Sequence, residues 1–398
     1  MNVLFLTMNV FTDIEMHNIY SDLMKEFIKH GHRPYIVTPR EKKLGEKTEL
    51  INYDDYSLLK VQIGNTSNVS LIEKGISTVT LSSKFYRAIK ENLGKIKFDL
   101  ILYSTPPITL ATPVVKLKKL FRCRTYLMLK DIFPQNAVDL EMFSNKSIVY
   151  KYFRMQEKKL YKVSDKIGCM SPANVKYILE KNSDINANKV ELCPNAIIPN
   201  DLQTSENNVE VIKSKYGIPQ DRKVFIYGGN LGKPQGIEFL IKCLIAEKDD
   251  LNAFFLIVGD GSEYGLIERA LLQNQCRNAK LIKKLPKSDY DSLVVACDVG
   301  MIFLDHRFTI PNFPSRLLSY MQAGMPVIAC TDLSSDIGKI IVDNKFGWWC
   351  ESECVESFKV IVSEACKANM AEMGSRGFEY LCENYNSCKV YEIIMKKC

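Results

Sequence analysis

The chain contains few of the residues from which metal sites and disulfide frameworks are built. It has four histidines in 398 residues, and its thirteen cysteines include no C-x-x-C pair. Cys350 and Cys354 stand closest together but have neither a second pair nor a suitably spaced histidine, so we expect no zinc site. A run of about 18 apolar residues is also missing, so we expect no helix that spans a bilayer. The opening residues 1–7 lack the pattern of a cleaved leader and are typical of a first core strand.

The cysteines that are present lie in or beside apolar runs, as Cys169, Cys193, Cys243, Cys297 and Cys330 illustrate. This placement favours reduced, buried thiols in a cytosolic protein.

Positive charge is concentrated in one region of the chain. The net charge is only +7, but residues 84–130 hold eleven Lys and Arg against two acidic residues. In residues 114–122 the cations alternate with aliphatic and aromatic groups, as in a helix that rests on an anionic membrane surface. Residues 151–154 and 158–162 extend this pattern. A solvated helix face would give the same pattern, and both interpretations stay open. Nucleic acid is not an expected partner, since no stacking platform is evident.

Apolar strands and helical stretches alternate along the whole chain, which predicts an α/β fold with mostly parallel sheets. A proline-bearing segment at 193–200 and a polar stretch at 201–208 separate two such series. We therefore expect two facing Rossmann-like domains, with ligands in the cleft between them, beyond the carboxyl ends of the strands. The predicted bounds are 1–194, 195–375 and a C-terminal helical segment, 376–398. The expected strands are 3–7, 35–38, 58–63, 100–104, 125–129, 166–170, 190–193, 224–227, 254–258, 280–282, 299–304 and 327–330, and the expected helices are 19–29, 83–92, 108–120, 148–163, 172–181, 237–247, 264–274, 289–296, 315–323 and 335–342.

A glycine-rich turn stands at the middle of the chain. Residues 228–236, Gly-Gly-Asn-Leu-Gly-Lys-Pro-Gln-Gly, follow the strand 224–227 and precede an apolar stripe of helical spacing, 237–245. Glycines allow close backbone approach, and a helix N-terminus attracts anions, so the turn predicts a phosphate site. Downstream, Arg316 follows another strand at the start of a helix that Ser315 is expected to cap and Gly324 to end. There its guanidinium can pair with a diphosphate.

These segments, taken in order, resemble glycosyltransferase family 4. The resemblance rests on Gly229-Asn230-Leu231-Gly232 with Gln235-Gly236, Val258-Gly259-Asp260-Gly261, Cys297-Asp298-Val299, Phe313-Pro314-Ser315-Arg316 with Tyr320, and residues 323–329. Within the family, Asp131-Ile132-Phe133-Pro134-Gln135 and residues 29–32 are similar to the bacterial surface-polysaccharide branch that includes N-acetyl-L-fucosamine and colanic-acid fucosyl transferases. The likeness spans essentially the whole chain and is stronger in the second domain.

The resemblance implies a GT-B fold and retaining transfer of a sugar from a nucleotide sugar, expected to be UDP-linked, with no cofactor and no metal. It places the donor diphosphate at Gly229, Asn230, Gly232, Lys233 and Arg316. The residues that it assigns to catalysis are Asp131, Lys233 and Arg316. The donor sugar and nucleoside are expected at Leu285, Asp305, Phe313, Pro314, Ser315 and Ser319. Asp13, Glu15 and Lys130 are the expected acceptor contacts.

The sequence departs from the family pattern at three places. Asn230 stands where relatives often carry a basic side chain, which makes Lys233 the first candidate for the missing positive charge. Two acidic residues of the family would fall at Pro311 and Ser319, and neither position is acidic. Ribose recognition is therefore left to weaker groups. The glycines of the family's N-terminal loop are replaced by residues around Asp13 and Glu15.

Two further carboxylate sites are predicted from the residues themselves. Asp131 follows the strand 125–129 and is expected to open on the cleft, although a turn-forming role would also suit it. Asp289-Tyr290-Asp291 has the spacing of a metal motif, but it follows Ser288 at a helix start and fits a capping box. We therefore assign Asp289 and Asp291 a structural role.

The sequence thus predicts a glycosyltransferase that acts on a lipid-diphosphate-linked glycan in O-antigen or capsule synthesis, at the inner face of the cytoplasmic membrane. The sugar would be L-FucNAc or a related deoxy-amino sugar. A nucleotide-sugar epimerase on the same plan and a non-catalytic nucleotide-sugar-binding scaffold subunit are the alternatives. A dinucleotide oxidoreductase does not fit, because the turn is not G-x-G-x-x-G.

Overall fold

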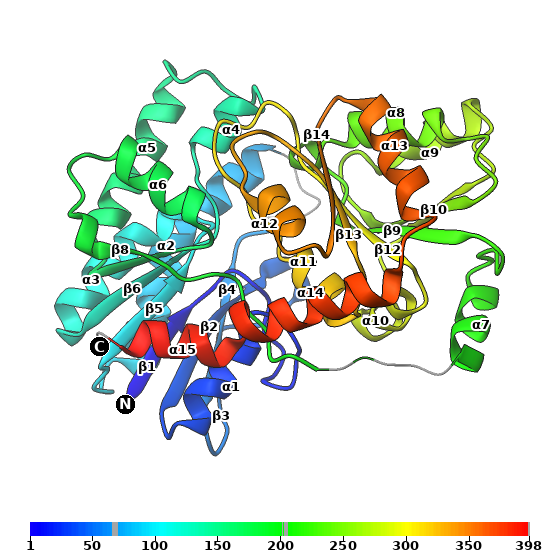
Figure 1. Cartoon of the computed structure of the whole chain (residues 1–398). Coiled ribbons are helices and arrows are strands. Elements are labelled where there is room, and N and C mark those ends of the chain that lie inside the picture. The colour runs from blue at the N-terminus through cyan, green and yellow to red at the C-terminus, as the bar shows by residue number, and fades with distance from the viewer. Residues whose placement is uncertain (66–70, 201, 203–205, 397–398) are drawn as a thin grey trace. The chain divides into compact units, whose positions relative to one another are not determined.

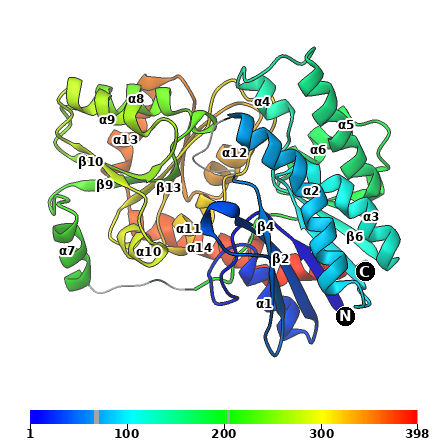
Figure 2. The ribbon, with the colours of Figure 1, turned by 180° about the vertical axis from the view of Figure 1, so that it is seen from behind.

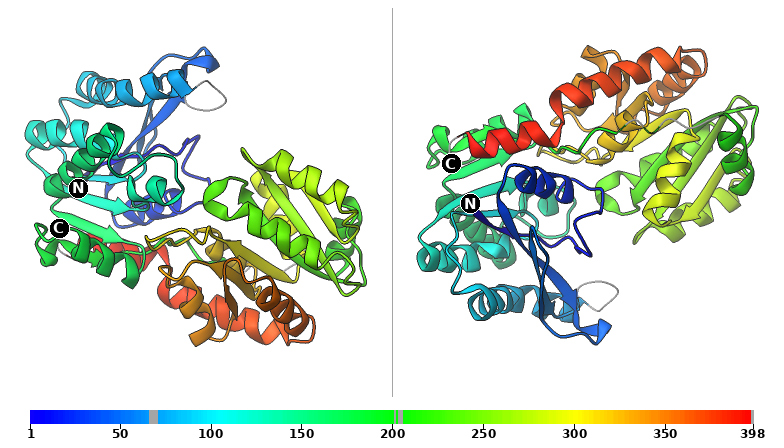
Figure 3. Two further views of the ribbon diagram at one scale, coloured as in Figure 1. Left: turned by 90° about the horizontal axis from the view of Figure 1, so that it is seen from above. Right: turned by 90° about the horizontal axis from the view of Figure 1, so that it is seen from below.

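The computed structural model describes residues 1–65, 71–200, 202 and 206–396, and they form two compact units. Unit 1 comprises residues 1–198 and 387–398, and unit 2 comprises residues 199–386. Both ends of the chain belong to unit 1 (Figure 3). The predicted boundary lies at 194/195, four residues before the one found here. Part of the predicted polar linker, residues 201 and 203–205, lies outside the described residues.

Unit 1 is built on an eight-stranded sheet in the order β3-β4-β2-β1-β5-β6-β7-β8 (Figure 1). Every neighbouring pair is parallel except β3 with β4. The strands are β1 (Asn2–Leu6), β2 (Arg33–Glu41), β3 (Glu49–Asn52), β4 (Ser57–Ile63), β5 (Leu100–Ser104), β6 (Arg124–Leu129), β7 (Lys166–Cys169) and β8 (Val190–Leu192). The antiparallel β3 was not predicted, because its four residues are mostly exposed and carry no strong apolar pattern.

Helices cover both faces of this sheet (Figures 1 and 2). They are α1 (Ser21–Lys29), α2 (Leu71–Leu93), α3 (Ala111–Phe121), α4 (Gln135–Asp139), α5 (Ile148–Val163), α6 (Pro172–Lys181) and α15 (Ser387–Met395), with short 3-10 turns η1 (Lys42–Leu44), η2 (Ile108–Leu110) and η3 (Ala187–Lys189). Alternate strand residues such as Val3 and Phe5 pack with α1 and α15 in one buried cluster. The helix α2 is much longer than the predicted 83–92.

The C-terminal segment returns to unit 1 later than predicted. The helix α14 (Met370–Asn384) stays in unit 2, and only residues 387–398 join unit 1. In α15, Tyr391 stacks on the ring of His30 with centroids 4.1 Å apart, and its hydroxyl lies 2.9 Å from Nε2 of His32. His30 and His32 therefore serve packing at the end of α1.

Unit 2 contains a six-stranded, wholly parallel sheet in the order β11-β10-β9-β12-β13-β14. Its strands are β9 (Lys223–Asn230), β10 (Ala253–Asp260), β11 (Ala279–Lys283), β12 (Val299–Phe303), β13 (Val327–Thr331) and β14 (Gly347–Glu351). Its helices are α7 (Glu206–Lys215), η4 (Lys233–Gln235), α8 (Ile237–Ala246), α9 (Tyr264–Gln273), α10 (Lys287–Val295), α11 (Arg316–Gln322), α12 (Ile337–Asp343), α13 (Val355–Ala365) and α14. The elements β14, α7 and α13 were not predicted.

Each sheet has one strand from which the chain first winds to one side and later to the other. In unit 1 this strand is β1, which lies between β2 and β5, and in unit 2 it is β9, which lies between β10 and β12. Such a switch point opens a crevice at the carboxyl ends of the strands, where α/β proteins bind ligands. The glycine turn after β9 stands at the switch point of unit 2.

The described part of the chain has no helix that is long and apolar enough to cross a membrane. All its cysteines are free, and Cys169, Cys193, Cys243, Cys297 and Cys330 are buried as the sequence predicts.

Candidate nucleotide-sugar site

The glycine turn begins later than the sequence predicts, because β9 continues through Gly228 and Gly229 to Asn230. The chain then passes through Leu231, Gly232 and the 3-10 turn η4 before α8 begins at Ile237. The backbone of Leu231 holds this passage in place. Its N–H donates to the carbonyl of Asp260 at 2.9 Å, and its carbonyl accepts from the N–H of Glu263 at 2.9 Å. The turn is thus fixed to the end of β10.

Arg316 lies directly against Gly229. A β-carbon at Gly229 would stand 2.9 Å from Nη2 of Arg316. Gly229 also has a backbone φ of +131°, which residues other than glycine rarely adopt. The guanidinium also lies over the ring of Tyr227, with 4.3 Å between Cζ and the ring centroid. Nη1 of Arg316 is buried and has no hydrogen-bond partner among the described residues. A buried guanidinium nitrogen without an acceptor is costly, so this atom is suited to an anionic ligand.

Two tyrosines hold the start of α11 against the end of β9. The hydroxyl of Tyr320 accepts from the N–H of Gly228 at 3.2 Å and lies 3.2 Å from the carbonyl oxygens of Ile226 and Met301. A β-carbon at Gly228 would meet the hydroxyl of Tyr290 at 1.8 Å. Burial raises the pKa of both phenols, to about 12 for Tyr320, so they stay neutral at physiological pH. They fix the distance between Arg316 and the glycines.

Lys233 and Asn230 bring polar side chains to the same turn. Both residues are exposed. The ammonium of Lys233 makes no ion pair within the described residues and is available to a ligand. Nδ2 of Asn230 donates to Oε1 of Gln235 at 2.9 Å, which leaves its second N–H for another acceptor. Burial, followed by the charge of Glu238, raises the pKa of nearby Glu263, while Lys233 opposes this shift.

Asp305 and Arg307 stand across the switch point, after β12. Nε and Nη2 of Arg307 donate to the two carboxylate oxygens of Asp305, each at 2.8 Å. Burial acts to raise the pKa of Asp305, but the bonds from Arg307 outweigh it and hold the pKa below its ordinary value. The backbone N–H of Asp305 donates to the carbonyl of Pro234 at 3.2 Å, which joins this loop to the glycine turn. Asp305 is therefore ionised and close to the turn, but both of its carboxylate oxygens already accept hydrogen bonds from Arg307.

The other predicted donor contacts lie on loops of unit 2, except Ser319, which lies on α11. Leu285 follows β11, and Pro314 and Ser315 precede α11. The ring of Phe313 is buried against Tyr385, with centroids 5.6 Å apart, so only its backbone can face a ligand. Ser319 is half-buried on α11. Ser315 was expected to cap α11, but it adopts helical angles and makes no capping bond. Gly324 ends this helix with φ +62°, as predicted.

The capping box predicted for the Asp-x-Asp segment is wrong. The helix α10 begins at Lys287, after Pro286, and has no side-chain cap. Asp291 pairs with Lys287 one turn earlier at 2.6 Å, and Asp289 lies 3.9 Å from Lys215. Across the described residues, no three His, Cys, Asp or Glu side chains gather where they could hold a metal ion.

In unit 1, Asp131 lies just beyond the carboxyl end of β6. Its carboxylate accepts from Nδ2 of Asn136 at 2.8 and 3.0 Å. Burial raises its pKa to about 6, although the hydrogen bonds from Ile132 and Asn136 act in the opposite direction. The carboxyl group can thus change charge near neutral pH. Thr105, after β5, accepts from the backbone N–H of Lys130 at 3.0 Å and ties the two strand ends together.

The side chain of Lys130 is directed into unit 1. Its ammonium donates to the carbonyl of Pro194 at 3.3 Å, and burial lowers its pKa. The ammonium is therefore held by the turn that follows β8. Its predicted acceptor contact would require it to leave that carbonyl.

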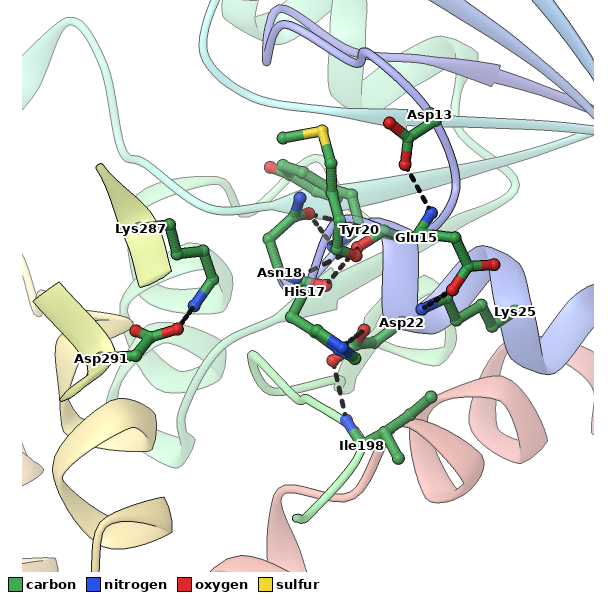
Figure 4. Close-up of polar contacts among 12 residues, drawn as sticks. Asp13, Glu15, His17, Asn18, Tyr20, Asp22, Lys25, Ile198, Lys287 and Asp291 are labelled. Carbon is green, nitrogen blue, oxygen red and sulfur yellow. Dashed lines mark hydrogen bonds and ion pairs between the residues drawn. The ribbon is translucent and has the colours of Figure 1, made fainter. Parts of the chain in front are cut away.

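Asp13 and Glu15 lie in the loop after β1, at the switch point of unit 1 (Figure 4). Oδ1 of Asp13 accepts from the N–H of Glu15 at 2.8 Å, so its carboxylate stabilises the loop. Glu15 is exposed and pairs with Lys25 at 3.4 Å. The same loop leads to the buried Asp22 on α1, which accepts from the N–H of Ile198 at 3.0 Å. Asp22 could not be singled out from the sequence, because its partner Ile198 is 176 residues away.

The tyrosines around Arg316 are residues of the candidate site that could not be singled out from the sequence. Tyr320 was noted only as part of a motif, and Tyr290 only as the middle of Asp-x-Asp. Tyr227 was assigned to a core strand. Its position, one residue before the paired glycines, is the signal that could have identified it as a platform for a cation.

Comparisons with known proteins show which chains this one is similar to. Residues 208–376 match the model of the family described as "Glycosyl transferases group 1". The chain is 23% identical to a Pseudomonas aeruginosa protein named "Probable glycosyltransferase WbjE" over 322 residues, 79% of this chain and 78% of that protein. The structure of WaaG, a glycosyltransferase involved in lipopolysaccharide biosynthesis, matches with a TM-score of 0.68 and 14% identity, covering 98% of this chain and 99% of WaaG.

A third likeness concerns a structure with a bound ligand. Anabaena Alr3699/HepE in complex with UDP and glucose matches with a TM-score of 0.72 and 14% identity, covering 100% of this chain and 98% of HepE. Two Rossmann-like units with parallel sheets, each with a switch point, are the GT-B fold that the sequence predicts. Residues 208–376 thus resemble a glycosyltransferase group 1 domain, in a chain with the GT-B fold.

Proposed function

We propose that this chain transfers a sugar from a nucleotide sugar to a glycan carried on a lipid diphosphate, with retention of the anomeric configuration. The observation that carries the proposal is Nη1 of Arg316, which is buried without a hydrogen-bond partner beside Gly229. A diphosphate at this turn would give that nitrogen an acceptor. It would also meet the backbone after β9 and the exposed ammonium of Lys233.

The proposed reaction needs no protein nucleophile. The acceptor hydroxyl oxygen bonds to the anomeric carbon on the face from which the diphosphate oxygen departs. The bond between that carbon and the diphosphate oxygen breaks, and the departing oxygen takes the acceptor proton. Arg316 and Lys233 stabilise the negative charge that develops on the diphosphate. Asp131 orients the acceptor or the donor sugar through its carboxylate.

The nucleotide part of the donor is proposed to be UDP, which is the nucleotide bound to HepE. Ser319 offers at most one hydroxyl to the ribose, so the diphosphate carries more of the donor's binding energy than the nucleoside does. The proposed sugar is L-FucNAc or a related deoxy-amino sugar, and the proposed products are O-antigen or capsule glycans. These assignments rest on the resemblance of residues 131–135 to the surface-polysaccharide branch.

One assay tests the proposal against its alternatives. The purified chain is given a panel of UDP-, GDP- and dTDP-sugars, with and without a lipid-diphosphate acceptor, and release of nucleoside diphosphate is followed. Release that depends on the acceptor supports transfer. Isomerisation of the donor without release would favour the epimerase, and binding without turnover would favour the scaffold subunit. Either of these results would overturn the proposed transfer.

A further inference from the structure

The helix α5 lies at the edge of unit 1 (Figures 1 and 2). Large apolar side chains are exposed along one side of it. Ile148 is 85% exposed, Met155 is 55% exposed and Tyr152 is 39% exposed. Their spacing of i, i+4 and i+7 places them on one stripe of the helix. Val149 beside them and Met142 in the preceding turn are also exposed. The opposite side of α5 is buried through Gln156, Glu157, Leu160 and Tyr161.

The exposed charges on this helix are all positive. Lys151, Lys158 and Lys162 are exposed, and Lys146 precedes the helix. The single acidic residue between 142 and 162 is Glu157, which is buried, accepts from the hydroxyl of Tyr161 at 2.8 Å and pairs with Arg154. The stripe therefore combines apolar groups with cations that no neighbouring carboxylate of α5 neutralises.

We propose that this face of α5 docks on an anionic lipid bilayer. Ile148, Tyr152 and Met155 would enter the headgroup region, while the lysines contact lipid phosphates. A second copy of this chain is a poorer occupant, because a two-fold contact would set the same lysines against one another. The proposed sugar transfer gives this docking a purpose, but the docking does not depend on it.

Aromatic packing connects the α5 face to Asp131. Phe153 of α5 lies edge-on against Phe133, with ring centroids 4.8 Å apart, and Tyr152 packs on Phe153 at 5.3 Å. Phe133 follows Asp131 by two residues. A bilayer that holds Tyr152 would therefore fix the loop that carries the proposed acceptor-side carboxylate.

The helix α3, for which the sequence leaves a membrane contact and a solvated face open, is less suited to a membrane contact. Val114 and Leu117 are buried, and Nζ of Lys118 pairs with Asp165 at 2.7 Å and donates to the carbonyl of Val163 at 3.0 Å. Lys116 lies over the ring of Tyr86 at 5.1 Å. Lys119 is exposed, but no apolar stripe accompanies it as one does on α5. The same lysine composition on α3 thus provides a matched comparison.

The test measures binding of the full chain to vesicles of phosphatidylcholine with 30% phosphatidylglycerol, by flotation. One variant replaces apolar groups (Ile148→Gln, Tyr152→Gln, Met155→Gln), and another replaces charges (Lys151→Gln, Lys158→Gln, Lys162→Gln). The apolar control is Leu272→Gln with Val360→Gln, which are 74% and 59% exposed in unit 2. The charge control is Lys116→Gln with Lys119→Gln on α3. Circular dichroism confirms that every variant folds, and UDP binding is measured separately.

We expect the charge variant to bind about a hundredfold more weakly at low salt, since a lysine near an anionic surface contributes about fivefold. The apolar variant should lose at least about tenfold, and both controls should bind like the unmodified chain. Three results would overturn the proposal: no binding by the unmodified chain, equal binding by the α5 variants, or a loss confined to the α3 control. Self-association that the apolar variant abolishes, without vesicle binding, would assign the face to a second copy. Failure of UDP binding or of transfer with vesicle binding intact would count against the proposed function alone.

Discussion

Arg316 fills the space that any side chain at Gly229 would need, with Nη2 2.9 Å from the position of a β-carbon there. The glycine and the arginine are 87 residues apart in the sequence, and Tyr320 and Tyr290 hold their strand end and helix start together. The paired glycines are therefore needed for two reasons besides close approach of a ligand. Neighbouring side chains leave no room for a β-carbon, and the backbone angle at Gly229 disfavours other residues. It also places the one buried, unpartnered guanidinium nitrogen found in the described chain at the switch point of unit 2.

Replacement of Gly229 by alanine should damage both stability and donor binding. The backbone angle of +131° costs a non-glycine residue about 1–3 kcal/mol, and the new methyl group would displace Arg316. We expect a lower Tm and a weaker affinity for nucleoside diphosphate, by differential scanning fluorimetry and calorimetry. Gly265→Ala is the control, because a β-carbon there meets nothing within 4 Å and the position lies in α9. A Gly229→Ala protein that matched this control in both readouts would contradict the arrangement.

Substitution of Arg316 should lower turnover as well as weaken diphosphate binding. Loss of one preorganised donor to a developing oxyanion typically lowers kcat by about 10²–10³-fold, so Arg316→Ala should fall in this range. Arg316→Lys keeps the charge but not the planar fork over Tyr227, and should recover only part of the rate. The exposed Arg269→Ala, on α9, serves as the control for loss of charge. Unchanged acceptor-dependent release by Arg316→Ala would rule out its proposed role.

Lys233 should affect ligand binding without affecting the fold. Its side chain is exposed and unpaired among the described residues, so Lys233→Ala should leave Tm unchanged. Affinity for the diphosphate should fall roughly tenfold at low salt, and the difference should shrink as salt screens the charge. Calorimetry at two salt concentrations measures both effects. A loss that does not depend on salt would indicate a structural role instead.

Asp131 should make activity depend on pH. Its pKa is raised by burial from 3.8 to about 6, so the carboxylate is protonated below that pH and ionised above it. If the ionised form contacts the substrate, kcat/KM should rise from pH 5 to pH 7 with a midpoint near 6. Asp131→Asn should remove that rise and lower kcat/KM at pH 7.5 by roughly ten- to hundredfold, the range for a hydrogen bond to a charged group.

The raised pKa of Asp131 should favour activity above pH 6 but lower the stability of the fold there. Because the pKa of Asp131 is higher in the folded than in the unfolded chain, its contribution is most favourable below about pH 4 and is lost as the pH rises through 6. Asp131→Asn should therefore raise Tm relative to the unmodified chain at pH 7.5, and much less at pH 4.5. A variant that is less stable at pH 7.5 would show that the carboxylate supports the fold.

Strong apolar periodicity made much of this fold predictable. The helices α5 and α6 and the strand β5 have the predicted bounds, because each is long or apolar enough to be recognised locally. The strand β3 and the helix α7 were missed, since β3 is largely exposed and α7 begins amid polar residues. The predicted end of β9 at residue 227 was wrong. Glycines often end a strand, but Gly228 and Gly229 continue β9 here and pair with β10.

The candidate site was predictable where one residue carries the chemistry. Arg316 and Lys233 stand as expected at the glycine turn. The hydrogen bond from Lys130 to Pro194 and the ion pair between Asp305 and Arg307 could not be predicted from the sequence. Each depends on which loops the folded chain brings together. The tyrosine contacts of Arg316 depend on the same long-range packing. Phe313 shows the converse case, in which a motif residue serves the core.

The most direct test of the central claim compares three ligands by calorimetry. UDP, UMP and uridine are titrated into the unmodified chain and into Arg316→Ala; if the panel assay shows release of another nucleoside diphosphate, the corresponding series is used. If Arg316 holds the diphosphate, the unmodified chain should prefer UDP over uridine strongly, and the substitution should collapse that preference while leaving uridine binding unchanged. If the substitution weakened all three ligands by the same factor, or left the preference intact, the diphosphate would not lie at Arg316 and the account of this site would be wrong.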